Sequence, residues 1–234
     1  MNEIVEARKH NRAALDEQAG KALLAQYGVA VPKTATVSGV DGVEQALKTL
    51  KLPVVVKIMS PDILHKSDAG GVKVNLKSAH EVKDAIAAMA ASPKIRGARI
   101  DGYLVEEMAA PGQEIVIGGL RDPQFGPMVM VGLGGIFVEV LADVSFRICP
   151  ITRLDAQDML AELKGAAILK GARGRKPVSQ EAIIDVLLKI GGEQGLLMQH
   201  ANDIKEADIN PLIVSESGAV AVDARFILTS GGEC

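Results

Sequence analysis

The sequence predicts a mixed α+β protein built from two subdomains. Segments with apolar residues at helical spacing alternate with short β-type runs along the first part of the 234-residue chain. After Pro93 the pattern changes, because strand-like segments then follow one another in series. Ser, Pro and Gly interrupt both patterns between residues 92 and 102. We therefore expect an N-terminal subdomain over residues 1–96 and a C-terminal subdomain over residues 97–234.

In the first subdomain, helices are expected to alternate with strands. Apolar residues at helical spacing predict a helix over residues 12–27, with Gly28 as its stop. Asp or Ser followed three residues later by Glu is a capping-box pattern, and it predicts helices that begin at Asp41 and Ser78. The predicted strands are 34–37, 54–58 and 72–76, and a loop is predicted over 60–71.

The second subdomain is expected to be rich in strands. The predicted strands are 103–108, 114–120, 127–131, 136–141 and 145–148. Helices are predicted over 152–163 and 179–190, with Thr152 and Ser179 as their N-caps. The chain is expected to end in a hairpin of residues 207–214 and 219–228.

The composition excludes several classes of function. Lys and Arg number 26 and Asp and Glu 29, so the net charge of −3 gives no general attraction to nucleic acid or an anionic membrane. With no Trp, two Tyr and four Phe, the chain has few rings for stacking on bases. The most apolar stretch, residues 127–138, is too short to cross a bilayer. Two distant cysteines form no disulfide framework, and we expect a reduced, cytoplasmic protein.

The common nucleotide-binding and hydrolase motifs are absent from the sequence. No G-x-x-x-x-G-K-[ST] segment is present, which excludes a Walker P-loop. Residues 132–137 begin like a dinucleotide fingerprint, but the third glycine is missing and a strand-like run follows. No G-x-S-x-G elbow or Ser-His-Asp order is found either.

A lysine and a glycine loop form the first candidate phosphate site. Lys57 ends an apolar strand, where its charge needs a partner such as phosphate, although an edge-strand lysine that reaches water is the alternative. In the loop H-K-S-D-A-G-G-V, Gly70 and Gly71 let backbone N–H groups approach a phosphate, and Lys66 adds positive charge. His65 titrates near neutrality and is nucleophilic when neutral. The alternative is a surface loop with an incidental histidine.

Two sets of carboxylates provide candidate ligands. Glu106 and Glu114, near Met108 at a strand end, can bind a ribose hydroxyl or an adenine amino group, although ordinary solvent-facing alternation is the alternative. Alternation places Asp208 and Asn210 on one strand face, and the final hairpin can bring Asp223 opposite them. Such oxygen donors suit Mg²⁺. The alternative there is a polar hairpin face on which Asp223 pairs with Arg225 or Lys205.

In this order, these motifs resemble a known family. They are similar to the ATP-grasp domain of nucleoside-diphosphate-forming acyl-CoA synthetases. The motifs that carry this resemblance are the strand lysine, the H-K-S-D-A-G-G-V loop, V-E-E-M, G-Q-E, G-L-G-G, D-I-N-P and V-D-A-R. The nearest resemblance is to the small β subunit of ADP-forming acetyl-CoA synthetase. It extends from about Leu15 to Leu228.

The resemblance implies a fold and a role for each candidate residue. The fold is an ATP-grasp fold with nucleotide bound between two subdomains. His65 would carry a phosphoryl group, and Asp208, Asn210 and Asp223 would bind Mg²⁺. The implied contacts to ATP or ADP come from Lys57, Lys66, Gly70, Gly71, Glu106, Met108 and Glu114. The hairpin between Asn210 and Asp223 is one residue shorter than in the more distant succinyl-CoA synthetase.

The resemblance also implies a reaction and a partner. The family interconverts acyl-CoA, ADP and phosphate with carboxylic acid, CoA and ATP, through an acyl phosphate and phosphohistidine. The CoA and acid sites belong to a larger α subunit, in an α₂β₂ assembly. We therefore expect this chain to need that subunit for the full reaction.

Three other hypotheses remain from the sequence. Another ATP-grasp carboxylate ligase would form an acyl phosphate directly and would keep its turnover in a His65→Ala variant. A non-catalytic regulatory subunit would bind nucleotide without acquiring phosphate. A nucleic-acid adaptor would use the basic stretch over residues 164–176, although a solvated loop or a subunit contact explains that stretch as well.

Overall fold

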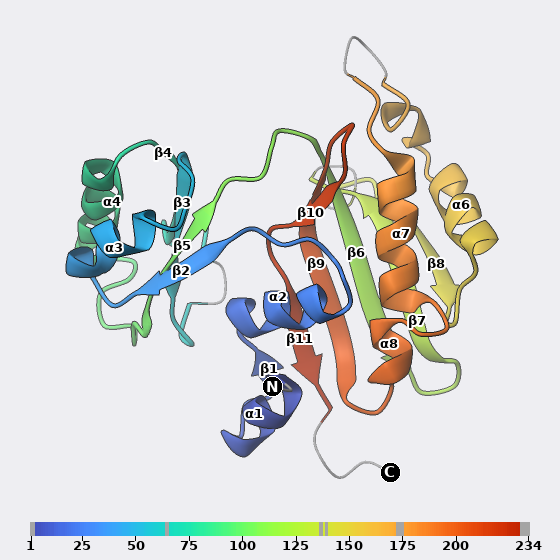
Figure 1. Ribbon diagram of the computed structural model, residues 1–234. Helices are drawn as coiled ribbons and strands as arrows, with labels where there is room; N and C mark the ends of the chain where they lie inside the picture. The colour runs from blue at the N-terminus through green and yellow to red at the C-terminus, as the bar shows by residue number, and fades with distance from the viewer. Residues whose placement is uncertain (1–2, 64–65, 136–137, 139, 172–175, 230–234) are drawn as a thin grey trace. The chain divides into compact units, whose positions relative to one another are not determined.

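The computed structural model describes residues 3–63, 66–135, 138, 140–171 and 176–229. Its contacts group the chain into two compact units: Pro32–Ala109, and Met1–Val31 together with Ala110–Cys234 (Figure 1). This grouping differs from the expected division at residue 96. The N-terminal segment belongs with the C-terminal strands, because Ala14 and Leu15 pair with Ile227 and Phe226. The larger unit is therefore discontinuous in sequence.

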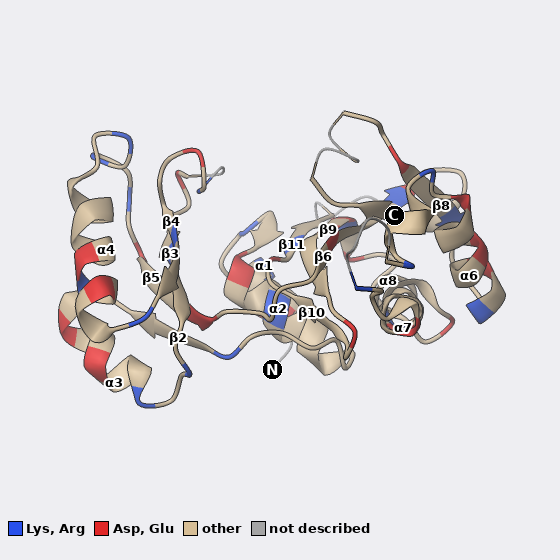
Figure 2. Ribbon diagram, turned by 90° about the horizontal axis from the view of Figure 1, so that it is seen from above, with Lys and Arg blue, Asp and Glu red and all other residues tan. Residues whose placement is uncertain are grey.

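The smaller unit is a four-stranded antiparallel sheet with two helices. The strand order is β2 (Thr34–Val37), β5 (Gly102–Glu107), β3 (Val54–Met59) and β4 (Val72–Leu76). Val56 and Ile58 of β3 pack with Ile86 of the helix α4 (Ala79–Ala91) in one core. Acidic side chains lie along α3 (Val43–Leu47) and α4 (Figure 2), and Glu44 and Lys83 join these helices with an Oε1–Nζ distance of 2.6 Å.

Two predicted helix starts in this unit have different outcomes. The hydroxyl of Ser78 accepts a hydrogen bond from the N–H of Glu81 at 3.2 Å, which confirms Ser78 as the N-cap of α4. The predicted start at Asp41 is wrong. A 3₁₀ turn over Val40–Gly42 leads directly into α3, so Asp41 lies inside that turn and the position before α3 is Gly42.

The larger unit is a seven-stranded antiparallel sheet with helices on one face. The strand order is β1 (Ala14–Leu15), β11 (Arg225–Leu228), β9 (Ile204–Val214), β6 (Gln113–Asp122), β7 (Gly126–Leu133) and β8 (Val144–Ile148), with β10 (Ala219–Ala221) paired to β9. The helices of this unit are α1 (Glu3–Lys9), α2 (Glu17–Gln26), α6 (Arg153–Glu162), α7 (Gln180–Gly191) and α8 (Leu196–Gln199), with a 3₁₀ turn at Ala166–Ile168.

Strand alternation gives this larger sheet two different faces. Gly119 lies against Leu197 of α8, and Gly191 of α7 lies against Val129, so these strand residues face the helices. Their neighbours in sequence, such as Gly118 and Met130, point to the opposite side. We call that side the open face. It carries the acidic and amide side chains that the sequence analysis selected on β9.

Three predicted elements of the larger unit differ from the structure. Part of the predicted strand over residues 136–141 lies outside the described residues, and Val140 and Leu141 lie in a turn rather than a strand. The predicted strand over 219–228 is divided into β10 and β11. The helix predicted over residues 12–27 is α2 and begins at Glu17, because the Asp16 carboxylate caps it by accepting from the Ala19 N–H. Within the described residues, no helix is long and apolar enough to span a membrane.

Candidate active site

Lys57 and Glu106 form a buried ion pair in the smaller unit. They occupy adjacent strands, since Lys57 is in register with Leu104 and Glu106 with Val55. The Lys57 Nζ lies 3.1 Å from Glu106 Oε1, with side-chain exposures of 10% and 2%. A lysine at the end of an apolar strand needs an anionic partner, and the partner of Lys57 in the structure is a carboxylate. The two residues that were expected to bind different parts of a nucleotide are therefore in direct contact.

The glycine loop has a backbone that requires glycine at residue 71. His65 and Leu64 lie outside the described residues. The N–H of Gly71 donates to the carbonyl of Lys66 at 2.7 Å, and the Gly71 carbonyl accepts from Ile58 at 2.8 Å. A Cβ at residue 71 would lie 2.5 Å from Ile58 Cγ2. Gly70 has a φ of +77°, a left-handed backbone conformation that favours glycine over residues with a side chain.

Contacts from the segment after α4 hold both sides of this loop. Lys94 Nζ donates to the carbonyl of Asp68 at 3.0 Å. The Asp62 carboxylate accepts from the Arg99 N–H at 2.7 Å. These contacts join residues far apart in the chain, so no local sequence pattern indicates them.

Met108 follows β5, next to the ion pair. Its N–H donates to the carbonyl of Pro53 at 3.3 Å, and its sulfur accepts from the N–H of Asn75 at 3.2 Å. The Met108 residue remains 39% exposed. The adjacent Glu107 accepts from the Lys51 N–H at 2.9 Å, which holds the end of β5 against the turn before β3. Met108 is thus positioned by backbone contacts on two sides.

In the larger unit, Glu114 of β6 is exposed beside the G-L-G-G stretch. The N–H of Gly134 donates to the Glu114 carbonyl at 2.9 Å, and a Cβ at residue 134 would lie 2.8 Å from the Glu114 Cβ. Gly134 therefore allows close packing against the strand that carries this carboxylate. The G-L-G-G stretch therefore packs against the strand at Glu114, and this packing role differs from that of a dinucleotide fingerprint.

The three predicted metal ligands lie on neighbouring parts of one sheet. Asp208 and Asn210 are exposed on β9, two residues apart. Asp223 follows Val222, whose N–H donates to the Pro211 carbonyl at 3.1 Å. This bond and the Arg225–Asp208 register bring the segment with Asp223 alongside Asn210. Asp223 lies in the interruption between β10 and β11, where its carboxylate accepts a hydrogen bond from the Ala224 N–H at 2.8 Å.

The donor chemistry of this set fits Mg²⁺. Carboxylate and amide oxygens are hard ligands, and exposed positions leave room for water and phosphate oxygens. Partial removal from water raises the pKa of Asp208, and the charge of Arg225 opposes that rise. In the part of the chain that the structure describes, no three His, Cys, Asp or Glu side chains gather as a metal cluster. The predicted set has two carboxylates, Asp208 and Asp223, and its third predicted donor is the Asn210 amide.

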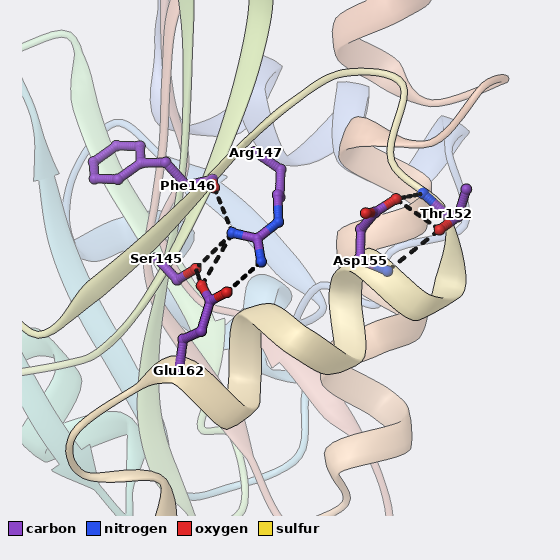
Figure 3. Close-up of polar contacts among 6 residues, drawn as sticks. All are labelled: Ser145, Phe146, Arg147, Thr152, Asp155 and Glu162. Carbon is purple, nitrogen blue, oxygen red and sulfur yellow. Dashed lines mark hydrogen bonds and ion pairs between the residues drawn. The ribbon is translucent and has the colours of Figure 1, made fainter.

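A polar network between β8 and α6 supports the far edge of the same sheet (Figure 3). The Ser145 hydroxyl donates to Glu162 Oε2 at 2.6 Å, and Arg147 donates to the same oxygen at 3.0 Å. Hydrogen bonding to Arg147 and Ser145 lowers the pKa of Glu162 to about 2. Thr152 and Asp155 form a reciprocal capping box at the start of α6. This network is on the helix side of β8, away from the predicted ligands.

The basic stretch over residues 164–176 has contacts at both of its ends. Buried Asp143 accepts hydrogen bonds from the backbone N–H groups of Lys164 and Gly165. At the other end, Lys176 Nζ lies 2.9 Å from a carboxylate oxygen of Glu216. Residues 172–175 lie outside the described residues. The charge of Lys176 is therefore partly offset within the chain.

Comparison with known proteins places this arrangement in a family. The model of the ATP-grasp domain matches residues 6–228, and the chain therefore belongs to the ATP-grasp family. It is 44% identical over 228 residues to the β subunit of acetate–CoA ligase (ADP-forming) I from Pyrococcus furiosus, with 97% of each chain covered. Within the family, the chain belongs to the β subunits of ADP-forming acyl-CoA synthetases.

Two further comparisons bear on the architecture. A solved structure of Ca. Korarchaeum cryptofilum dinucleotide forming acetyl-coenzyme A synthetase 1, in complex with coenzyme A, Ca-AMPCP and HgCl⁺, matches with a TM-score of 0.90 at 42% identity. It covers 97% of this chain and 98% of that chain. Acetate–CoA ligase (ADP-forming) I of Archaeoglobus fulgidus is 41% identical over 97% of this chain, but this region is only 33% of that longer protein. The family and fold expected from the motifs are confirmed, whereas the roles of individual residues stay predictions.

Proposed function

We propose that this chain transfers a phosphoryl group between ATP and His65 within the reaction of acid, CoA and ATP to acyl-CoA, ADP and phosphate. The full-length similarity to a β subunit supports this proposal, because the relative is named as part of an enzyme of that reaction class. Asp208, Asn210 and Asp223 supply the donor types that the proposal requires.

The proposed step balances without a further reactant. A lone pair of the neutral His65 imidazole attacks the γ-phosphorus of ATP, and an N–P bond forms. The bond between that phosphorus and the β–γ bridging oxygen breaks, and ADP leaves with the electron pair. The reverse reaction returns the phosphoryl group to ADP. Phosphoryl transfer depends mainly on positioning and charge neutralisation.

The other residues are assigned to binding and positioning. Lys57 and Lys66 contact phosphate oxygens, and the backbone at Gly70 and Gly71 approaches them closely. The proposed nucleoside contacts are Glu106, Met108 and Glu114. Asp208, Asn210 and Asp223 hold Mg²⁺, which supplies positive charge next to the phosphates when bound.

A larger subunit completes the proposed enzyme. In the Archaeoglobus relative, this region is joined to the rest of a longer chain. We propose that a separate α subunit holds the CoA and acid sites, in an α₂β₂ assembly in the cytoplasm. The isolated chain should then bind nucleotide but make no acyl-CoA.

A labelling experiment tests the transfer. The chain is purified with its larger subunit and incubated with Mg²⁺ and ATP labelled at the γ-phosphate. We expect acid-labile, base-stable label on His65 that ADP removes, and no label at that position in His65→Ala. The matched control is His80→Ala, which replaces an exposed histidine of α4 with a side-chain exposure of 86%.

Two results would favour another function. Full turnover in His65→Ala would point to a ligase that forms an acyl phosphate directly. Nucleotide binding without label on this chain, even with the larger subunit present, would point to a regulatory subunit.

A further inference from the structure

The edge strand of the smaller sheet, β4, contains a β-bulge. The register of β3 and β4 shifts between Val54 and Val56, so that Val55 of β3 lies opposite two residues of β4, Val74 and Asn75. Asn75 has a φ of +61°, in the left-handed region. Asparagine adopts this region more readily than most residues that carry a side chain, whereas β-branched residues avoid it. A bulge redirects the groups of a strand and is common next to a functional site.

The bulge directs a backbone donor of Asn75 towards the side chain of Met108. The Asn75 N–H donates to the Met108 sulfur, with 3.2 Å between the two atoms. Met108 follows β5, and β3 lies between β5 and β4 in the sheet. The Met108 side chain therefore reaches across the level of β3 to contact the bulge. Its backbone N–H donates to the Pro53 carbonyl at 3.3 Å, so both ends of the residue are held.

The bulge also lies in the row of positions that contains Glu106, the partner of Lys57. Val56 of β3 and Val105 of β5 belong to the core between the sheet and the helices α3 and α4 (Figure 1). Their neighbours Val55 and Glu106 face the opposite side, because successive side chains of a strand alternate. Glu106 is in register with Val55, and the bulge lies opposite Val55 on its other flank.

We propose that Asn75 is a positioning residue of the nucleotide site, and that its left-handed bulge holds the Met108 side chain where that side chain contacts the nucleoside. The inference rests on the proposed function, in which Met108 is a nucleoside contact. Asn75 acts through Met108 and touches no part of the nucleotide. A methionine side chain has three rotatable bonds, so a donor that fixes its sulfur removes motion that nucleotide binding would otherwise have to stop.

Three substitutions of asparagine test the role of the bulge. Asn75→Val disfavours the positive φ, whereas Asn75→Gly keeps both that conformation and the backbone N–H. The matched control is Asn11→Val, since Asn11 is an exposed asparagine of the larger unit with a φ of +51°. Each variant is purified with the larger subunit, and the initial rate of His65 labelling is measured against the concentration of ATP.

We expect Asn75→Val to raise the ATP concentration for half-maximal labelling about fivefold, the loss that corresponds to one hydrogen bond. The maximal rate should stay within about twofold, because the phosphate and metal ligands are unchanged. Asn75→Gly and Asn11→Val should leave the half-maximal concentration within about twofold of the unmodified complex. In a Met108→Leu background, which lacks the sulfur acceptor, Asn75→Val should have little further effect.

Methyl NMR of the complete complex tests the contact without nucleotide. The chain has eight methionines, and Met108→Leu identifies the Met108 methyl resonance by its loss. We expect Asn75→Val to move this resonance more than Asn75→Gly does, and Asn11→Val to leave it in place.

Several results would overturn the positioning role of Asn75. These are equal half-maximal concentrations in Asn75→Val and Asn11→Val, an increase that Asn75→Gly shares, or additive effects of Asn75→Val and Met108→Leu. A Met108 resonance that does not respond to Asn75→Val would overturn it as well. If the unmodified complex acquires no label, the proposed function fails instead, and the methyl spectrum still decides whether Asn75 positions Met108.

Discussion

Lys57 and Glu106 lie side by side on adjacent strands, with 3.1 Å between Nζ and Oε1 and little access to water. Two charges removed from water stabilise a fold only while both are present, because a single remaining charge is costly. This pair therefore links the stability of the smaller unit to residues with proposed nucleotide contacts.

We expect Glu106→Ala to destabilise the smaller unit by about 3–5 kcal/mol, because Lys57 would lose its buried carboxylate. Unfolding in urea can be followed through Tyr103 fluorescence in a Tyr27→Phe background, since the chain has no Trp and two Tyr. The control is Glu44→Ala, which removes an exposed ion pair with Lys83 and should lower the stability far less than Glu106→Ala does. Equal losses of unfolding free energy in Glu106→Ala and Glu44→Ala would contradict the stabilising role of the buried Lys57–Glu106 pair.

We expect Asp208→Asn to weaken Mg²⁺-dependent ADP binding at least about tenfold, or ~1.4 kcal/mol, since it removes one of two carboxylates from the ligand set. Calorimetry of ADP binding with and without Mg²⁺ measures this change. Asp185→Asn is the control, because Asp185 pairs with Lys189 on the exposed side of α7. The assignment fails if Asp208→Asn leaves the metal-dependent part of the affinity unchanged.

We expect Gly71→Ala to slow labelling of His65 more than Gly70→Ala does. The added methyl at residue 71 would meet Ile58 at 2.5 Å and shift the loop, whereas residue 70 has open space around its Cβ position. The Gly70→Ala substitution costs about 1 kcal/mol of stability, because alanine disfavours the positive φ at residue 70. Initial labelling rates measure the difference. Gly97 has a similar φ of +91° but lies outside the loop. In the control variant Gly97→Ala, His65 should therefore be labelled at the normal rate.

Acid should weaken the attachment of α6 to β8. The pKa of Glu162 is lowered from 4.5 to about 2, mainly by hydrogen bonds from Arg147 and Ser145. Its stabilising contribution is therefore present above pH 4.5 and is lost as the pH falls towards 2. The measurement is the midpoint of thermal unfolding from pH 6 to 2. In Glu162→Gln, we expect the midpoint of thermal unfolding to depend less on pH over this window. An unchanged dependence of the midpoint on pH would contradict the stabilising role of ionised Glu162.

Local patterns predicted several elements well. The predicted strands 34–37 and 72–76 coincide with β2 and β4, because β-type runs there end at turn residues. The predictions for residues 136–141 and 219–228 were less successful. An apolar run alone does not distinguish a strand from a turn, and Val140 and Leu141 lie in an exposed turn. The break before β11 includes the backbone hydrogen bond from Val222 to Pro211.

The sequence by itself determined the ATP-grasp family, the candidate loop and the types of ligand, because these depend on residue chemistry and on short spacings along the chain. Only the tertiary structure decided that Lys57 pairs with Glu106 and that β1 joins β11. It also decided that Asp208 lies in one row with Arg225 and Phe146. The physical reason is strand register, which sets the distant residues that share one face, and which a single sequence specifies only through packing of the whole sheet.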